Sequence, residues 1–269
     1  MINAKAIGFT IAFAIVGTML LITGCGGGSG GTSYPIPTLP ANAVVLDTTN
    51  AIDIANRAVS DSGYVGTSAR QANILLSVKG VIDLLADQMN STEQHTSVAT
   101  GVSQTTIIPC TDDGDITITV DGNESSAIGT LRFNNCTEGT VIVNGSISFD
   151  GTGDSAGNFS VNGGGRINIT DTIDPTSITM VMNFRESGNT STGSFSSSFS
   201  FSIEGLPGGG FLVETIQPLT GAGFDVTSGE IMVYGGNGTR IRILITAPNT
   251  AEVFVDEGSG FVSVGFISL

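Results

Sequence analysis

Three cysteines are the residues with the most distinctive chemistry, and the first, Cys25, follows a stretch with the layout of an export signal. Lys5 supplies the one side-chain charge in this stretch, an apolar run extends over residues 6–22, and the small residues Thr23 and Gly24 precede the cysteine. A basic start, an apolar middle and small residues before a cleavage position are typical of secretory signals. The sequence therefore predicts that the chain is exported.

The four residues Ile22-Thr23-Gly24-Cys25 resemble the lipobox of bacterial lipoproteins. The resemblance implies a signal peptide over residues 1–24, cleavage before Cys25, and acylation of Cys25 with two chains, often followed by a third, so that the lipid anchor holds the chain on a membrane. Gly26 stands where an Asp would retain such a protein at the inner membrane, which implies the outer membrane, on its periplasmic or surface face. Each buried CH₂ contributes about 0.8 kcal/mol, so two or more acyl chains anchor stably.

An ordinary transmembrane helix is the alternative interpretation of this stretch, because the seventeen residues 6–22, rising about 1.5 Å each, almost span a bilayer. A simple membrane helix needs neither a cysteine at this position nor the Gly/Ser-rich run that follows over residues 26–33. Three closely spaced prolines at positions 35, 37 and 40 then favour extended backbone. We expect residues 25–42 to form a lipidated cysteine and a flexible tether that lifts the folded part off the lipid.

The other two cysteines, Cys110 and Cys136, lie 26 residues apart beside predicted strands. In the oxidising compartment that an export signal implies, such a pair is typical of a disulfide. Closing a loop of this length contributes about 3–4 kcal/mol in the chain-entropy model. A metal pair is the alternative, but the only histidine is far away in sequence and the two cysteines lack the short spacing of zinc sites.

That histidine, His95, is the single candidate general base for a serine, threonine or cysteine nucleophile. It lies in the polar stretch 90–95, and the sequence has no Gly-x-Ser-x-Gly motif to accompany it. A solvated loop histidine is the simpler interpretation. We therefore predict that the chain is not an enzyme, and we assign it no catalytic residue.

Several carboxylates lie close together in predicted turns. A calcium site is therefore an alternative to ordinary acidic turns. Alternating oxygens can wrap a hard cation, but none of these turns has the full ligand count of a calcium loop. Paired carboxylates could also hydrolyse glycosides, although the chain has no Trp and 3 Tyr to form sugar platforms. We predict no metal or cofactor. The groups are Asp112, Asp113 and Asp115, then Asp150 with Asp154, and Asp256 with Glu257.

The composition excludes broad classes of partner. Lys and Arg total 9 against 24 Asp and Glu, a formal charge of −15, and this balance excludes an electrostatic footprint for nucleic acid. It also argues against adhesion to anionic lipid through a polybasic patch. Only 12% of the residues are charged and 38 are Gly, while 40% are hydrophobic. Enough apolar surface for a core, with Ser, Thr, Asn and Gly outside it, favours an extracellular β-protein.

Apolar residues with helical spacing predict a helix over 47–60, with Asp47 or Thr48 as its N-cap, and a second helix over 68–89. Together they would form a helical hairpin within residues 43–104. Each apolar face must be buried, and we expect the second helix to pack on the β-domain through a stripe that consists of Ile74, Val78, Ile82 and Leu85.

From Cys110 onward the apolar period changes to two, which predicts about ten short strands and a β-domain over 105–269. The expected fold is mainly β: an antiparallel meander forming a curled sheet, an incomplete barrel or a sandwich, preceded by the helical hairpin. Asn144-Gly145 would be either a hairpin or a Gly bulge in one long strand. The turn signals are Asp121-Gly122, Asn144-Gly145, Asp150-Gly151, Asn162-Gly163 and Asn237-Gly238.

Residues 105–269 are also similar in style to uncharacterised Gly/Ser/Thr-rich bacterial lipoproteins. The similarity rests on the run Arg132-Phe133-Asn134-Asn135 before Cys136, on Gly-Thr-x-x-x-Asn-Gly at 139–145, and on the tail from Gly238. It implies no activity. We therefore expect a membrane-anchored lipoprotein with a structural or interaction role and an unknown protein partner. The alternative is a carrier that holds an apolar ligand or lipid in a cavity between sheet and helices.

Overall fold

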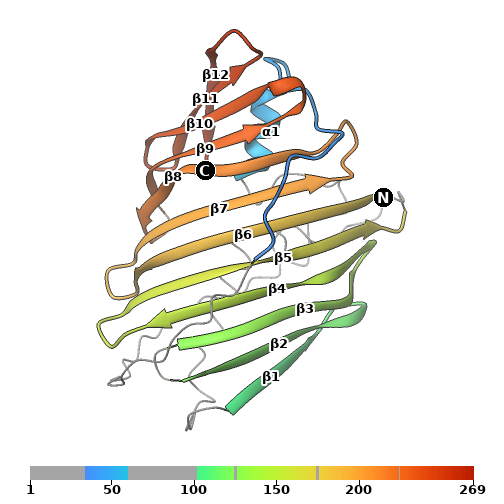
Figure 1. Cartoon of the computed structure of the whole chain (residues 1–269), viewed down its shortest axis with the longest axis vertical. Coiled ribbons are helices and arrows are strands. Elements are labelled where there is room, and N and C mark those ends of the chain that lie inside the picture. Colours follow the sequence, from blue (N-terminus) through green and yellow to red (C-terminus); the bar gives the residue numbers. More distant parts are fainter. Residues whose placement is uncertain (1–33, 60–101, 124–125, 174–175, 224) are drawn as a thin grey trace, which may run out of the picture.

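The structure, a computed structural model, describes residues 34–59, 102–123, 126–173, 176–223 and 225–269. Within these residues one α-helix, α1 (Ala51–Val59), precedes a single sheet of twelve antiparallel strands, in which each strand pairs with its neighbours in sequence (Figure 1). The predicted mainly-β meander is confirmed, as one open sheet rather than a sandwich. The strands are β1 (Val102–Pro109), β2 (Asp113–Asn123), β3 (Ser126–Glu138), β4 (Val141–Gly153), β5 (Asn158–Asp171), β6 (Ser177–Asn189), β7 (Ser194–Glu204), β8 (Phe211–Ala222), β9 (Asp225–Tyr234), β10 (Arg240–Ala247), β11 (Thr250–Asp256) and β12 (Phe261–Ser268).

Side chains alternate between an inner face, which carries the apolar core, and an outer face, which is mostly polar. The strand register keeps this alternation aligned: Leu131 pairs with Ile147, and Ile147 pairs with Gly165. A slip of one residue would turn every apolar side chain of a strand to the outer face, so burial of the inner face fixes the register. Other large, fully buried side chains of the inner face are Phe133, Phe149, Ile167, Met182, Phe211, Ile231 and Ile241.

Glycine and phenylalanine alternate along one row of the inner face. Gly129 pairs with Phe149, Phe149 pairs with Gly163, and Gly163 pairs with Phe184. A Cβ atom on Gly129 would overlap the ring of Phe149, and one on Gly163 would overlap the ring of Phe184. The glycines therefore provide the space that the phenyl rings fill.

Replacing Gly163 by valine should displace the ring of Phe184 and lower the free energy of unfolding by about 1–3 kcal/mol, the usual effect of overpacking a core. Urea denaturation of the purified chain measures this change. Gly153 of β4 is a matched control, because a Cβ there meets only the carbonyl oxygen of Asn158, at 3.6 Å. Gly153→Val should change the stability by less than about 0.5 kcal/mol. Equal losses in the two variants would contradict the packing role of Gly163.

Helix α1 begins with the predicted cap. Asp47 Oδ1 accepts hydrogen bonds from the backbone N–H groups of Thr49 and Asn50, at 2.8 and 3.0 Å, and Asn50 Oδ1 accepts one from the N–H of Asp47 at 3.0 Å. This reciprocal pair is a capping box. The helix contacts β10, β11 and β12. The second predicted helix, 68–89, lies outside the described residues. The side chains that α1 buries are Ala51, Ile54, Ala55 and Ala58.

Residues 34–46, which we call the strap, cross the sheet from the level of β5 toward β9 before the chain continues into α1 behind the sheet (Figure 1). Val44 donates its N–H to the carbonyl oxygen of Gly210 at 2.8 Å, and its own carbonyl accepts the N–H of Gly236 at 2.7 Å. Leu46, at the end of the strap, is fully buried. The Pro-rich end of the predicted tether is therefore held against the sheet.

Three of the predicted turns, at Asp121-Gly122, Asp150-Gly151 and Asn162-Gly163, are wrong. Asn237-Gly238 does form a turn between β9 and β10. The other four dipeptides lie inside β2, β4 and β5, which are longer than expected because their glycines pair across the sheet. Asn144-Gly145 is thus part of one long strand, and not a hairpin. The sheet also begins earlier than the predicted boundary at residue 105, since β1 starts at Val102.

Candidate functional site

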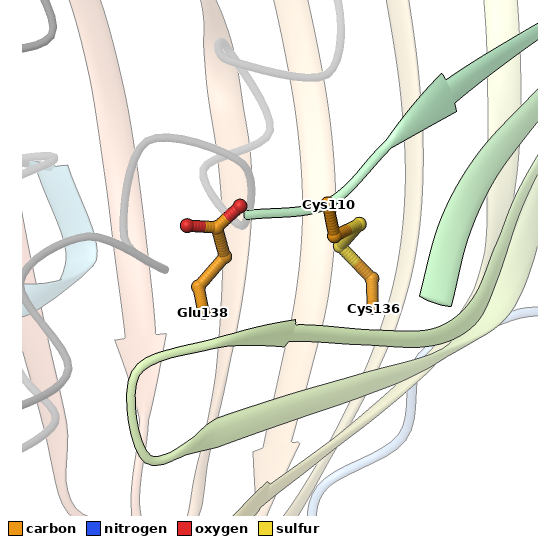
Figure 2. Close-up of side chains that lie close together, drawn as sticks. All are labelled: Cys110, Cys136 and Glu138. Atoms are coloured by element: carbon orange, nitrogen blue, oxygen red, sulfur yellow. A yellow bond between two sulfur atoms is a disulfide. The ribbon is translucent and has the colours of Figure 1, made fainter. Parts of the chain in front are cut away.

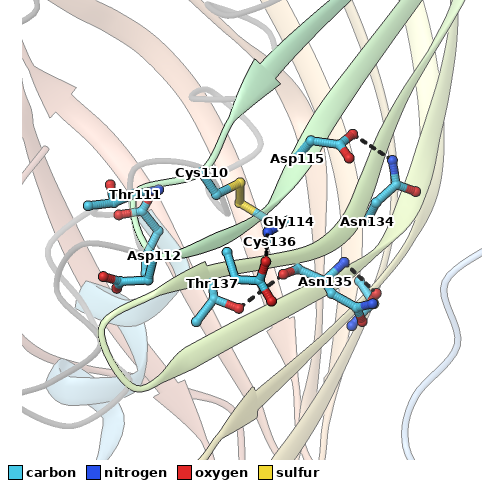
Figure 3. Close-up of a disulfide and its surroundings, with 12 residues drawn as sticks. Cys110, Thr111, Asp112, Gly114, Asp115, Asn134, Asn135, Cys136 and Thr137 are labelled. Atoms are coloured by element: carbon cyan, nitrogen blue, oxygen red, sulfur yellow. Dashed lines mark hydrogen bonds between the residues drawn. A yellow bond between two sulfur atoms is a disulfide. The ribbon is translucent and has the colours of Figure 1, made fainter.

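A disulfide between Cys110 and Cys136 joins the segment after β1 to β3 (Figure 3). The two Cα atoms lie 5.4 Å apart, within the range of bridged cysteines. Cys136 is fully buried in the core cluster. The predicted disulfide is confirmed, and it encloses the whole of β2 in a covalent loop.

Acidic side chains lock the loops on either side of this disulfide. Asp112 Oδ2 accepts the N–H of Gly139 at 2.6 Å, and Glu138 Oε1 accepts the N–H of Thr111 at 3.0 Å. The N–H of Asp112 donates in turn to the carbonyl oxygen of Thr137, at 3.1 Å. Asp112, a candidate ligand in the sequence, therefore satisfies a backbone group of one loop, and Glu138 does the same for the other.

The disulfide and Glu138 are, within the described parts of the chain, the one group of three potential metal ligands, with ligand atoms within 4.8 Å of one another (Figure 2). Zinc requires cysteine as a thiolate, and sulfurs bonded to each other do not supply one. Glu138 is already held by Thr111. The group fits a disulfide supported by a hydrogen-bonded carboxylate, and not a metal centre.

The first calcium-like turn is also occupied by protein donors. Asp150 Oδ1 accepts the hydroxyl of Tyr34 in the strap, and Asp150 Oδ2 accepts Asn162 Nδ2 at 3.0 Å. Asp154 accepts the N–H and the Nδ2 of Asn158, both at 2.9 Å. These contacts lower the pKa of Asp154 below its ordinary value. The two carboxylates thus fix the strap and a turn, respectively.

In the second calcium-like turn, the carboxylates of Asp256 and Glu257 also accept hydrogen bonds from protein groups. Asp256 Oδ2 accepts Arg240 Nη2 at 2.5 Å, and Asp256 Oδ1 accepts the N–H groups of Gly258 and Gly260 at 2.8 and 2.9 Å. The hydrogen bond from Arg240 is the main reason why the pKa of Asp256 lies below its ordinary value. Glu257 accepts a backbone N–H of the segment before α1. The carboxylate of Asp256 therefore closes the β11–β12 connection through hydrogen bonds from protein groups.

A bulge next to the disulfide reshapes the outer face. Asn134 and Asn135 of β3 together oppose the single residue Asn144 of β4. Asn135 has a positive φ of 50°, and its N–H donates to Asn144 Oδ1 at 2.9 Å. Figure 3 shows Asn134 and Asn135 on neighbouring positions of β3, with Asn134 directed toward Asp115 of β2. The bulge thus turns three amide side chains toward the same part of the outer face.

These amides line a depression between β3 and β4 with a volume of ≈ 530 Å³, which we call the outer-face hollow. Its polar lining residues are Thr130, Arg132, Asn134, Asn135, Asn144 and Ser146. Arg132 pairs with Ser146 across the two strands, and Ser146 pairs with Arg166 of β5, so two arginines flank one serine on the same face. The hollow combines charge, hydroxyls and amides, and it is the candidate functional site.

Asp115 supports one wall of the outer-face hollow. Its Oδ1 accepts Asn134 Nδ2 and Thr117 Oγ1, both at 2.7 Å. The bond from Asn134, followed by that from Thr117, lowers the pKa of Asp115 below its ordinary value of 3.8. The carboxylate therefore stays ionised at neutral pH and holds Asn134 in a fixed orientation. Sequence reasoning named Asp115 but missed the hollow, because strand alternation predicts an outward face without predicting which strands are neighbours.

Two residues that the sequence singled out, Cys25 and His95, lie outside the described residues. In the part of the chain that the structure describes, no helix has both the length and the apolar character needed to cross a membrane. No protein-family model, curated protein or solved structure matches this chain.

Proposed function

We propose that the chain is an exported lipoprotein, anchored through Cys25 and placed at the outer membrane, that acts by binding and not by catalysis. The outer face of the sheet is its interaction surface in this proposal. One observation carries it: the apolar inner face is already buried within the folded chain, whereas outer-face side chains of β3–β5 such as Arg132, Ser146 and Arg166 are exposed.

Burial of the inner face weighs against the carrier alternative. An empty cavity large enough for a lipid would leave water-accessible surface on the apolar side chains that line it. Leu131, Ile147, Ile167 and Met182, at the centre of the inner face, are each 0% exposed. They belong to one continuous core cluster that extends from β2 to β12. A filled core of this kind favours an interaction module.

The hydrogen bonds of the carboxylates support a non-catalytic role. A general acid or base must be able to reach a proton on a substrate. Asp112, Asp154 and Asp256 each accept backbone N–H groups, and Asp115 and Asp150 accept side-chain donors. Their geometry is that of structural groups. The open polar groups of the outer face are neutral side chains, arginines and a few exposed carboxylates such as Asp121 and Glu204.

The proposal can be tested by site-specific crosslinking in the native host. A photoreactive phenylalanine at Ser146, inside the outer-face hollow, should give a discrete adduct, while the same residue at the exposed Ser268 of β12 should not. Native mass spectrometry of the chain purified from membranes tests the alternative. Equal crosslinking at both positions would contradict a specific role of the outer-face hollow, and a stoichiometric apolar ligand in the purified chain would argue for the carrier.

A further inference from the structure

The outer-face hollow contains both donors and an acceptor that the protein itself does not use. Asn144 Oδ1 is fixed by the N–H of Asn135, so its Nδ2 is left to donate. Asn134 Nδ2 donates to Asp115 and Thr117, so its Oδ1 is left to accept. Within the described residues, neither of these two remaining amide atoms has a hydrogen-bond partner. The hollow is thus oriented for a ligand that both accepts and donates hydrogen bonds.

Arg132 adds a positive charge that no carboxylate neutralises by direct contact. Elsewhere on the outer face, Arg240 and Arg242 form ion pairs with Asp256 and Glu230. Among the described residues, Arg132 forms no such ion pair: the nearby carboxylate of Asp115 is held by other donors, and the charge of Arg132 is the smallest of the causes that lower its pKa.

Arg166 extends this charge along the face. Arg132, Ser146 and Arg166 are direct cross-strand neighbours, and all three are exposed. Strands lie about 4.8 Å apart, so the two arginine Cα atoms are about 10 Å apart. An anionic ligand seated in the hollow therefore meets Arg132 in its lining and can extend toward Arg166.

We propose that the outer-face hollow binds an acidic sugar, with the ligand carboxylate on Arg132 and its hydroxyls on Asn134 and Asn144. A guanidinium recognises a carboxylate through two parallel hydrogen bonds. Sugar hydroxyls can both donate to Asn134 Oδ1 and accept from Asn144 Nδ2. The volume of ≈ 530 Å³ lies within the usual range of small-molecule sites. No aromatic platform is needed, because polar contacts supply the recognition.

This inference deepens the binding role proposed above by naming a ligand class. Binding of the sugar is measured on the purified, full chain in detergent. A failure to bind would therefore leave the crosslinking and anchoring results unchanged. Isothermal titration uses digalacturonate as the probe, up to about 10 mM, a range that detects Kd values near 1 mM. Neutral digalactose and inorganic phosphate are titrated in parallel under the same conditions.

The expected result is binding of digalacturonate that is weakened by added salt and reduced roughly tenfold or more by Arg132→Gln, the usual effect of losing a charge-assisted hydrogen bond. Arg185→Gln is the matched control, since Arg185 is exposed on the same face but does not line the hollow. It should bind like the wild type. Asn144→Ala tests the hydroxyl contact and should weaken binding less than Arg132→Gln does.

Four results would overturn the inference. The first is no binding of digalacturonate by the wild type, and the second is equal loss in the Arg132→Gln and Arg185→Gln variants. The third is binding of phosphate, but not of digalacturonate, that depends on Arg132, because the hollow would then be a plain anion site. Equal binding of digalactose and digalacturonate would likewise remove the role assigned to the charge of Arg132. Circular dichroism of each variant confirms that the sheet is retained.

Discussion

Replacing Cys25 by serine should abolish acylation completely and leave the precursor uncut. A serine hydroxyl does not replace the thiol to which the acyl chains are attached, and by its resemblance to a lipobox the sequence at 22–25 requires cysteine at the cleavage position. Two or more acyl chains make attachment stable where one gives only marginal binding. Metabolic labelling with palmitate and intact-mass analysis of the membrane fraction measure the outcome.

The matched control for this experiment is the double variant Cys110→Ala/Cys136→Ala. It lacks the other two cysteines but keeps the leader, so it should retain the palmitate label and the processed mass. A wild-type protein whose mature N-terminus is unmodified, or begins elsewhere than Cys25, would refute the anchor. Label that persists in Cys25→Ser would also refute it.

The same double variant should lose about 3–4 kcal/mol of unfolding free energy when its stability is measured. The bond between Cys110 and Cys136 closes a loop of 26 residues, which restricts the unfolded chain more than the folded one. For a chain of this size, about 3 kcal/mol corresponds to a fall in Tm of roughly 6–12 °C. Thermal unfolding of the purified chain provides the measurement.

Reduction of the wild type breaks the disulfide but keeps the side chain of the buried Cys136. It therefore separates the stability lost with the covalent loop from the stability lost with the core volume of Cys136. Wild type in reductant should approach the stability of the double variant, because both then lack the covalent loop. Non-reducing peptide mapping should recover Cys110 and Cys136 in one fragment. Free thiols at both positions in exported protein, or unfolding that is insensitive to reductant, would contradict a stabilising disulfide.

Much of the fold could be predicted from the sequence because strand alternation is a local signal. The period of two along residues such as Ile116 and Ile118 reflects one buried face, and both side chains are buried as the pattern requires. The cap of α1 at Asp47 is local in the same sense. Turn positions were less predictable, because an Asn-Gly or Asp-Gly pair is compatible with both a turn and a strand. Asn162-Gly163 is part of a strand because Gly163 pairs with Phe184 on the next strand, a contact that is distant in sequence.

The candidate site depends even more on contacts between residues that are distant in sequence. The disulfide could be predicted, since only two cysteines remain once Cys25 is assigned to the anchor. The outer-face hollow depends on the register of three strands and on a bulge at Asn135, and neither is visible in one sequence. Arg132 and Arg166 are 34 residues apart in the chain yet flank the same serine. Non-local pairing therefore creates the site from residues that look unremarkable individually.

The short length of chain between Cys25 and the strap finally limits how far an anchored molecule can stand from its membrane. Nine residue steps separate Cys25 from Tyr34 (34 minus 25), and a fully extended chain spans at most about 3.6 Å per residue, or about 32 Å in total. Tyr34 is held by Asp150 on the outer face of β4. If Cys25 carries the acyl chains, this face stays within about one bilayer-core thickness of the lipid. Molecules that reach the hollow would then be those of the membrane-proximal layer, and a longer spacer inserted after Gly31 would change which of them it meets.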